Sequence, residues 1–281
     1  MTVGIIGIDH PVVAVKDMAE AHERYRRLGF TIPPRGSHLE WGTGNWCIMF
    51  ADDYLELRGI VASSRYVHGL DRFLERREGL MGIAFQPEAA ETTYLKARAA
   101  GIDATPPREL TRRFELPEGE VHPRFRLVFF PEHQTAGLMA SLVCEHLTPE
   151  LIRRPEWLTH ANGALGVAEV GAVVTDLGPV QAQQEKLFGA GAVRRRSDRL
   201  LVEVGRGARV EFLTQAAARQ ESLAVGEVEP PYLAWITIRV ARLAAAASVL
   251  QRNGVAFRQD GGAVIRIAPE DACGTILRFA Q

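Results

Sequence analysis

Residues 7–30 pass from an apolar run to a helical pattern of apolar positions. The apolar run carries a single histidine, His10, and leads to a turn expected at residues 16–17. Beyond the turn, apolar side chains recur every three or four residues, at Met18, Ala21, Tyr25 and Leu28. This spacing is typical of an amphipathic helix, and Gly29 is a common type of helix terminator. The pattern therefore predicts a short buried strand followed by a helix that packs on it.

The plan of one strand followed by one helix recurs three more times along the chain. The four helices are expected to end at Gly29, Gly101, Gly189 and Gly254. Short extended segments follow each helix, so the repeated unit is a strand, a helix and then further strands. Unit boundaries near residues 78, 160 and 225 divide the 281 residues into two domains of paired units. We place these domains at residues 1–160 and 161–281.

A hairpin is predicted over residues 37–50 of the first unit, because two strand-like stretches flank a glycine-rich turn. Four of its side chains carry a polar group, either on an aromatic ring or as an amide: His38, Trp41, Asn45 and Trp46. Groups of this kind suit the mouth of a ligand pocket, so we predict that these four residues bind substrate. The alternative for the two tryptophans is that they fill the core.

His10 and Glu56 are expected to meet on the concave side of the first unit. In the strand at residues 54–57, alternation sends the two leucines to the helix side and Glu56 to the other side. The residues that alternate with His10 should also pack on the helix, so the imidazole should face Glu56. We assign no lysine or arginine of the first unit to a matching strand position, although a buried carboxylate needs a cation, a proton or several donors. The pair is therefore predicted either to hold a divalent cation or to be structural.

One imidazole and one carboxylate suit zinc, iron, nickel or manganese, and they leave coordination positions open for substrate oxygens. His146, at the end of the last strand of the second unit, is a candidate third ligand, or alternatively caps the following turn. A metal held in this way would act as a Lewis acid on two neighbouring oxygens. Glu56 would then also be the catalytic group that shuttles a proton.

These features together resemble the vicinal oxygen chelate superfamily and, within it, the glyoxalase-like branch. The resemblance rests on residues 7–30, on the Tyr54-Leu55-Glu56-Leu57 strand, on Gly42-Thr43 with Asn45, on residues 146–157 and on the four repeats. It implies an α+β fold in which four βαβββ modules form two open barrels of mixed sheet. It also implies a metal-dependent lyase, isomerase or dioxygenase acting on a small molecule with vicinal oxygens. The alternative within the superfamily is a metal-free binding protein of the bleomycin-resistance kind.

The metal positions implied by this resemblance carry suitable residues in only part of the chain. They fall on His10 and Glu56 in the first unit, and on Glu169 and Glu211 in the third. In the second and fourth units they fall near Gly82, Ser141, Trp235 and Arg278, of which only the serine could bind a cation, and then weakly. We expect Glu169 and Glu211 to lie on adjacent strands and to face one cup. Like charges this close should raise at least one pKa unless Arg278 intervenes, and we expect no metal between them.

Charge and cysteine content limit the partners and the compartment. The 33 basic and 34 acidic side chains nearly cancel, which argues against a broad surface for nucleic acid or for an anionic membrane. The three cysteines lie far apart, so neither a disulfide framework nor a thiolate zinc site is predicted. We therefore expect a cytoplasmic protein without a signal peptide or membrane span, whose partner is a small-molecule substrate. Assembly into a homodimer is left open.

Overall fold

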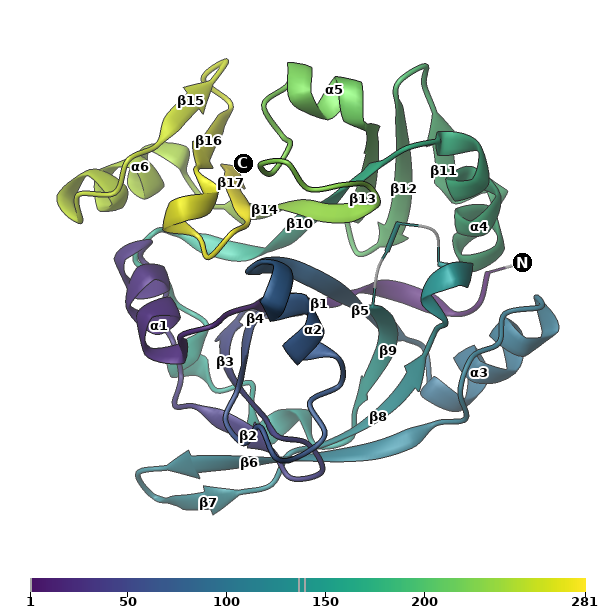
Figure 1. Cartoon of the computed structure of the whole chain (residues 1–281). Helices are drawn as coiled ribbons and strands as arrows, with labels where there is room; N and C mark the ends of the chain where they lie inside the picture. The colour runs from purple at the N-terminus through teal and green to yellow at the C-terminus, as the bar shows by residue number, and fades with distance from the viewer. Residues whose placement is uncertain (1, 136, 139) are drawn as a thin grey trace.

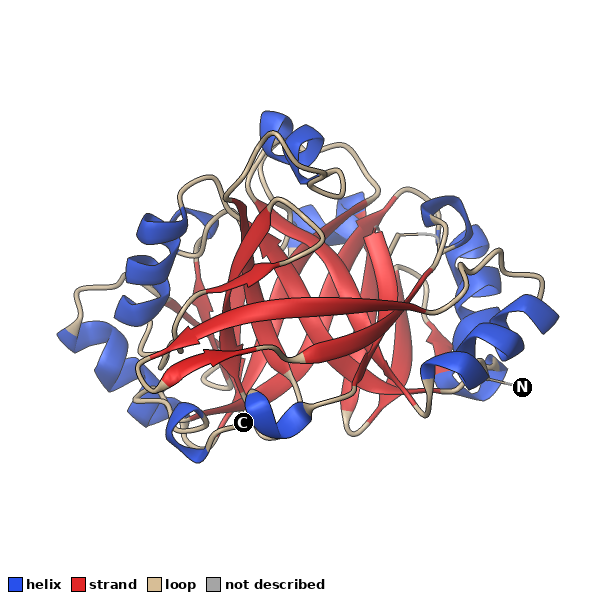
Figure 2. Cartoon of the chain, turned by 90° about the horizontal axis from the view of Figure 1, so that it is seen from below, coloured by secondary structure: helices blue, strands red, loops and turns tan. Residues whose placement is uncertain are grey.

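The computed structural model describes residues 2–135, 137–138 and 140–281 and has a mixed α+β fold (Figure 1). Strands of two sheets occupy the middle of the molecule, and the helices lie around them (Figure 2). The helices are α1 (Met18–Arg27), α2 (Leu70–Arg76), α3 (Ala90–Ala99), α4 (Leu177–Phe188), α5 (Gln215–Gln220) and α6 (Leu243–Arg252). Within the described residues, every helix is too short or too polar to cross a membrane.

The first sheet has nine strands in the order β2-β3-β4-β1-β5-β9-β8-β6-β7. Its strands are β1 (Ile5–Ala14), β2 (Gly36–His38), β3 (Thr43–Met49), β4 (Tyr54–Ile60), β5 (Gly79–Pro87), β6 (Arg108–Leu116), β7 (Gly119–Val121), β8 (Arg124–Phe129) and β9 (Ala140–His146). β1 runs parallel to β4 and antiparallel to β5. β2 also pairs with β6, with Gly36 opposite Phe114, so this sheet closes into a barrel.

The second sheet has eight strands in the order β11-β12-β13-β10-β14-β17-β16-β15. Its strands are β10 (Ala164–Val174), β11 (Val193–Arg195), β12 (Arg199–Gly205), β13 (Ala208–Thr214), β14 (Tyr232–Val240), β15 (Arg258–Asp260), β16 (Val264–Ile267) and β17 (Ile276–Ala280). β10 repeats the role of β1, because it runs parallel to β13 and antiparallel to β14.

The predicted fold of four βαβββ units in two mixed sheets is confirmed. The first two units build the first sheet, and the last two build the second sheet. The first sheet differs from the open barrel we expected, because the pairing of β2 with β6 closes it. One apolar cluster contains buried side chains from both sheets, among them Val13 and Val170. The two sheets therefore share a core, and a domain division at residue 160 stays a prediction.

Local sequence sets the start, the end and the packing of helix α1. The Asp17 carboxylate accepts hydrogen bonds from the backbone N–H groups of Ala19 and Glu20 at 2.8 and 2.9 Å, which starts the helix. Gly29 has a φ of 91°, in the left-handed region that favours glycine, and this ends it. The buried ring of Tyr25 packs the helix on the outside of the barrel. The inner face of β1 is thereby left for polar side chains.

Candidate functional site

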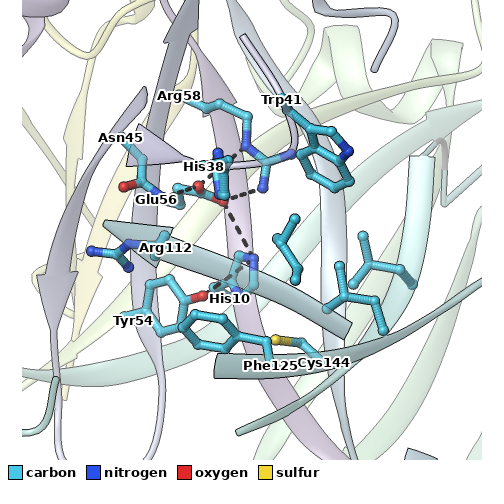
Figure 3. Close-up of a pocket in the computed structure, with 13 residues that line it drawn as sticks. His10, His38, Trp41, Asn45, Tyr54, Glu56, Arg58, Arg112, Phe125 and Cys144 are labelled. Carbon is cyan, nitrogen blue, oxygen red and sulfur yellow. Dashed lines mark hydrogen bonds and ion pairs between the residues drawn. The ribbon is translucent and has the colours of Figure 1, made fainter. Parts of the chain in front are cut away.

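Polar side chains gather inside the first barrel around a cavity of about 20 Å³ (Figure 3). This volume holds about one water molecule. The lining residues come from strands on all sides of the barrel and from the β2–β3 loop: His10, His38, Trp41, Asn45, Tyr54, Glu56, Arg58, Leu110, Arg112, Phe125, Leu127, Leu142 and Cys144.

A β-bulge in β1 turns both Asp9 and His10 toward the interior. The pairing of β1 with β5 shifts register between Ile8 and His10, so Asp9 is the extra residue. The Asp9 carboxylate is fully buried, and its Oδ1 lies 2.6 Å from His10 Nδ1. Burial by itself would raise the pKa of Asp9, but His146 and His10 hold that pKa well below its usual range. Asp9 is therefore a buried anion beside His10, which the sequence pattern missed.

Three side chains contact the Glu56 carboxylate. Arg58 donates from Nε to Oε1 at 3.1 Å and from Nη2 to Oε2 at 2.6 Å. Asn45 Nδ2 donates to Oε1 at 2.6 Å, and His10 Nε2 lies 3.3 Å from Oε2. Burial would raise the pKa of Glu56, yet Arg58 and His10 hold it well below its usual range. The expectation that no lysine or arginine of the first unit occupies a matching strand position is wrong, because Arg58 lies two residues after Glu56 on β4 and shares its face.

His10 lies between two carboxylates. Its Nδ1 faces Asp9 and its Nε2 faces Glu56, so the predicted proximity of His10 and Glu56 is observed. The ring of Tyr54 stacks on the imidazole, with centroids 4.2 Å apart and an angle of 20° between the planes. Burial by itself would lower the pKa of His10, but the hydrogen bonds to Asp9 and Glu56 raise it above its ordinary value of 6.5. The arrangement therefore favours the imidazolium form.

A metal ion between His10 and Glu56 does not fit these surroundings. A metal needs a neutral imidazole with a free lone pair, whereas both nitrogens of His10 face carboxylates. The guanidinium of Arg58 lies 2.6 Å from Glu56 Oε2, so a cation bound to this oxygen would lie beside another cation. The carboxylate already has the positive partner that a metal would supply.

The second unit adds no ligand at the corresponding positions. In the parallel pairing of β1 with β4, Val12 lies opposite Glu56. In the parallel pairing of β5 with β9, Ala84 lies opposite Leu142. The counterpart of Glu56 is therefore Leu142, and the counterpart of His10, two residues before Val12, is Gly82, two residues before Ala84. Neither side chain can bind a cation.

His146 does not join His10 and Glu56 in the structure. Its Nε2 lies 2.9 Å from Oδ2 and 3.1 Å from Oδ1 of Asp9. Asp9, Cys144 and His146 are side chains of types that can bind a metal, and their donor atoms all lie within 4.8 Å of one another. They are the one such group of three among the described residues. The three ligands predicted from the sequence are therefore not brought together as one set.

Three of the four predicted hairpin residues line the inner cavity. His38, Trp41 and Asn45 do so, and burial lowers the pKa of His38 to about 3, so its ring is neutral. Trp46 lies on the opposite face of β3, where its Nε1 donates to the carbonyl of Met18 at 2.9 Å. Alternation along β3 sends neighbouring side chains to opposite faces, so Trp46 is not part of this cavity. Substrate binding by the other three stays a prediction.

A second, larger cavity of about 490 Å³ adjoins the inner one and opens beside the exposed ring of Tyr66. The residues that line both cavities are Trp41, Leu110, Leu127 and Leu142. The rings of Trp41 and His68 stack, with centroids 4.9 Å apart and 19° between the planes. The ring centroids of His68 and Phe129 are also 4.9 Å apart. Burial lowers the pKa of His68 to about 4, so this ring is also neutral. His68 and Phe129 belong to no recognisable motif, so the sequence pattern missed them.

The second sheet carries the carboxylate pair predicted from the repeats. Glu169 and Glu211 lie on the adjacent strands β10 and β13, and the register places both on one face. Arg278 Nη1 lies 3.2 Å from Glu169 Oε1, and Arg278 and Trp235 lower the pKa of Glu169 against the effect of burial. Burial and the nearby Glu169 raise the pKa of Glu211. The predicted placement of the two carboxylates is confirmed. Arg278 contacts Glu169 as predicted, but it does not prevent the raised pKa of Glu211, and Arg209 lies closer to Glu169, at 2.6 Å.

Trp235 fills the space beside this pair. Its Nε1 donates to Glu169 Oε1 at 2.7 Å, and its ring lies over Gly171. A Cβ at Gly171 would lie 1.7 Å from a ring carbon of Trp235, so only glycine fits at this position. The cup of the second sheet is therefore occupied by a tryptophan and by ion pairs.

Solved structures with the same fold include proteins of several kinds. A hypothetical protein from Staphylococcus aureus is 11% identical, with a TM-score of 0.70 and coverage of 97% of this chain and 98% of the other. A variant of 4-hydroxymandelate synthase from Streptomyces coelicolor is 13% identical, with a TM-score of 0.64 and coverage of 98% and 92%. A variant of homoprotocatechuate 2,3-dioxygenase from B. fuscum is 12% identical, with a TM-score of 0.58 and coverage of 99% and 72%. At these identities the likeness shows the fold alone.

Sequence comparison adds a family to the fold. No curated protein matched the chain in sequence. The family model of the glyoxalase-like domain matches residues 8–188, which is more than half of the chain and includes every strand that lines the inner cavity. This match shows that the chain belongs to the glyoxalase-like domain family, and the four units and the barrel agree with it.

Proposed function

We propose that this protein binds a flat apolar small molecule in the cavity of about 490 Å³, with no metal ion between His10 and Glu56. The observation that carries the proposal is the two-point ion pair of Arg58 with Glu56, which already balances the carboxylate inside the barrel. Hydrogen bonds to Asp9 and Glu56 also raise the pKa of His10 against the effect of burial, which favours its protonated form. The proposed role is the metal-free binding role that the sequence left as an alternative.

The lining of the larger cavity favours a planar ligand with a polar edge. Trp41, His68 and Phe129 offer neutral or apolar rings in stacked and tilted orientations, and aromatic rings attract flat ligands in such geometries. Ser141 is part of this lining, although its Oγ is itself buried and has no hydrogen-bond partner among the described residues. The charged side chains of Glu40, Arg108, Glu109 and Glu132 also line this cavity, so its walls combine aromatic faces with polar groups and suit a flat ligand that has a polar edge.

A metal-dependent lyase, isomerase or dioxygenase acting on vicinal oxygens is the second candidate. It is favoured by the 3.3 Å between His10 Nε2 and Glu56 Oε2, because two ligands that each lie about 2.1 Å from one ion are separated by a similar distance. Two of the similar structures are a synthase and a dioxygenase by name. The role of Glu56 as a proton shuttle is weakened, because a carboxylate with a low pKa is a poor proton acceptor. We therefore rank this candidate second.

The proposal is tested with 8-anilinonaphthalene-1-sulfonate, a flat aromatic probe whose fluorescence rises in apolar surroundings. We expect saturable binding that EDTA does not change. Trp41→Ala should weaken binding about fivefold, because a stacked ring contributes on the order of 1 kcal/mol. Leu165→Ala removes an exposed apolar side chain on β10 and is the control.

Two results would overturn the proposal. Equal weakening in Trp41→Ala and Leu165→Ala would show that the probe binds the surface and not the cavity. Metal content that falls in both His10→Gln and Glu56→Gln, together with probe binding that EDTA abolishes, would place the metal-dependent enzyme first.

A further inference from the structure

We propose that Asp9, Cys144 and His146 form a binding site for Zn²⁺ or a similar transition-metal ion, next to the His10–Glu56 pair, because Asp9 Oδ1 lies 2.6 Å from His10 Nδ1. Each residue offers one donor atom, and these three atoms lie within 4.8 Å of one another. A carboxylate, a thiolate and an imidazole are the ligand types that zinc combines in proteins. The three residues lie in the barrel wall beside the inner cavity, which Cys144 lines.

The barrel brings these residues together from two strands that are not neighbours. Cys144 and His146 are two residues apart on β9, so their side chains share the inner face. The bulge in β1 turns Asp9 to the same interior. β5 separates these two strands, and the small side chain of Ala84 lies between them, opposite His10 on one side and Leu142 on the other. A larger residue at this point would separate the donors.

Two buried polar atoms of the cluster lack a hydrogen bond. Asp9 is fully buried, and its Oδ2 has no hydrogen-bond partner in the part of the chain that the structure describes. His146 Nε2 is 2.9 Å from this oxygen, but the hydrogen bond it makes is to Oδ1, at 3.1 Å. His146 Nδ1 is likewise buried and unpartnered within the described residues. Unpaired buried polar atoms are costly, and a bound cation would satisfy His146 Nδ1 and give Asp9 Oδ2 a partner in addition to its ion pair with His146.

Cys144 differs from the nearby Cys47, which provides a matched control. Cys47 is also buried in the first barrel, but its Sγ accepts a hydrogen bond from Arg112 Nη1 at 3.2 Å. A guanidinium at the sulfur opposes a metal cation. Cys144 instead lies beside Asp9 and His146. Widely spaced cysteines argued against a thiolate zinc site in the sequence, yet one cysteine is sufficient when the other donors come from distant residues.

Metal binding at this site requires loss of the thiol proton. Burial, together with the charge of Asp9, raises the pKa of the Cys144 thiol well above its ordinary value, so the free protein holds the thiol form. The metal would form a bond to sulfur while the thiol proton leaves to solvent, with no change of oxidation state.

Cobalt(II) titration of the full-length protein tests the site, because a cobalt–thiolate bond gives a near-ultraviolet charge-transfer band. We expect this band to appear with one cobalt per chain in the wild-type protein and in Cys47→Ser. Cys144→Ser should lose the band, and His146→Gln should bind cobalt at least about tenfold more weakly. Glu56→Gln should retain the band, because the contacts of Glu56 are to Asn45, Arg58 and His10, and this distinguishes the site from a metal held by His10 and Glu56.

The outcomes are decisive even if one variant fails to fold. Cys144→Ser changes a single atom, so circular dichroism should show a native fold. A band that survives in this variant, or cobalt affinity equal to that of the wild-type protein, would overturn the site. The fluorescent probe should bind Cys144→Ser as it binds the wild-type protein, so failure of the metal site and failure of the proposed function are distinguishable.

Discussion

Arg58 and Glu56 form a two-point ion pair inside the first barrel, from positions two residues apart on β4. Glu56 is 1% exposed and Arg58 is 8% exposed, so water contributes little to their solvation. A buried carboxylate without a cation would be costly, and here the same strand supplies the cation. The barrel interior is thereby balanced by the protein's own charges at the position where the superfamily resemblance implied a metal.

Glu56→Gln should lower the free energy of unfolding by about 3–5 kcal/mol, because Arg58 would remain buried without its anion. Adding Arg58→Met should recover part of this loss, since no unpaired buried charge then remains. Urea denaturation of the three proteins measures both effects. Glu20→Gln removes only an exposed ion pair with Arg24 and should change stability little. A Glu56→Gln loss no larger than that of this control would contradict the prediction.

His10 should make the folded state less stable as the pH rises. Its folded-state pKa lies above its ordinary value of 6.5, so its contribution is fully present below about pH 6.5 and is lost as the pH passes through the folded-state pKa. His10→Gln should remove this part of the pH dependence. Urea denaturation from about pH 6 to about pH 9 tests this, with His133→Gln, at an exposed position, as the control. Equal pH slopes in His10→Gln and the wild-type protein would count against it.

Asp53 should also make the folded state less stable as the pH rises, although its side chain is a carboxylic acid and not a base. Its Oδ1 accepts a hydrogen bond from the Val167 N–H at 2.9 Å, yet burial raises its pKa from 3.8 to about 7. The folded state therefore prefers the protonated form, and stability is lost as the pH rises from about 4 to about 7. Asp53→Asn keeps an acceptor without the charge, so it should be more stable than the wild-type protein above about pH 7 and gain nothing below about pH 4.

The neighbouring carboxylate provides the control for that prediction. Asp52 is exposed and pairs with Arg206 at 3.2 Å. Thermal unfolding of Asp52→Asn should follow the wild-type protein at each pH. An advantage of Asp53→Asn that does not grow with pH would show that the buried carboxyl is not responsible.

Gly171→Ala should be strongly destabilising, because the new Cβ would lie 1.7 Å from a ring carbon of the buried Trp235. Overpacking of a core costs about 1–3 kcal/mol and sometimes more. Gly191→Ala is the control, because a Cβ at that glycine meets nothing within 4 Å. Combining Gly171→Ala with Trp235→Leu should restore part of the loss in denaturant unfolding. A double variant less stable than Gly171→Ala alone would show that the ring is not the obstacle.

The repeats and the position of His10 relative to Glu56 could be predicted because they depend on short-range patterns. A helix terminator such as Gly29 and the alternation of side chains in β4 are local properties of the chain. The two strands that were expected to be buried, β1 and β4, are buried. The same alternation places Arg58 on the face of Glu56, although the sequence did not show that the guanidinium turns back to this carboxylate.

The amino-acid sequence by itself therefore determined the four units and the inward directions of His10 and Glu56, because periodicity within one strand or helix is sufficient for these. Only the tertiary structure decided the partners of the polar groups. The bulge that turns Asp9 inward and the meeting of Asp9 with His146 across β5 depend on how separate strands pair. A register shift of one residue reverses the face of every later side chain, and no pattern within a single strand records it.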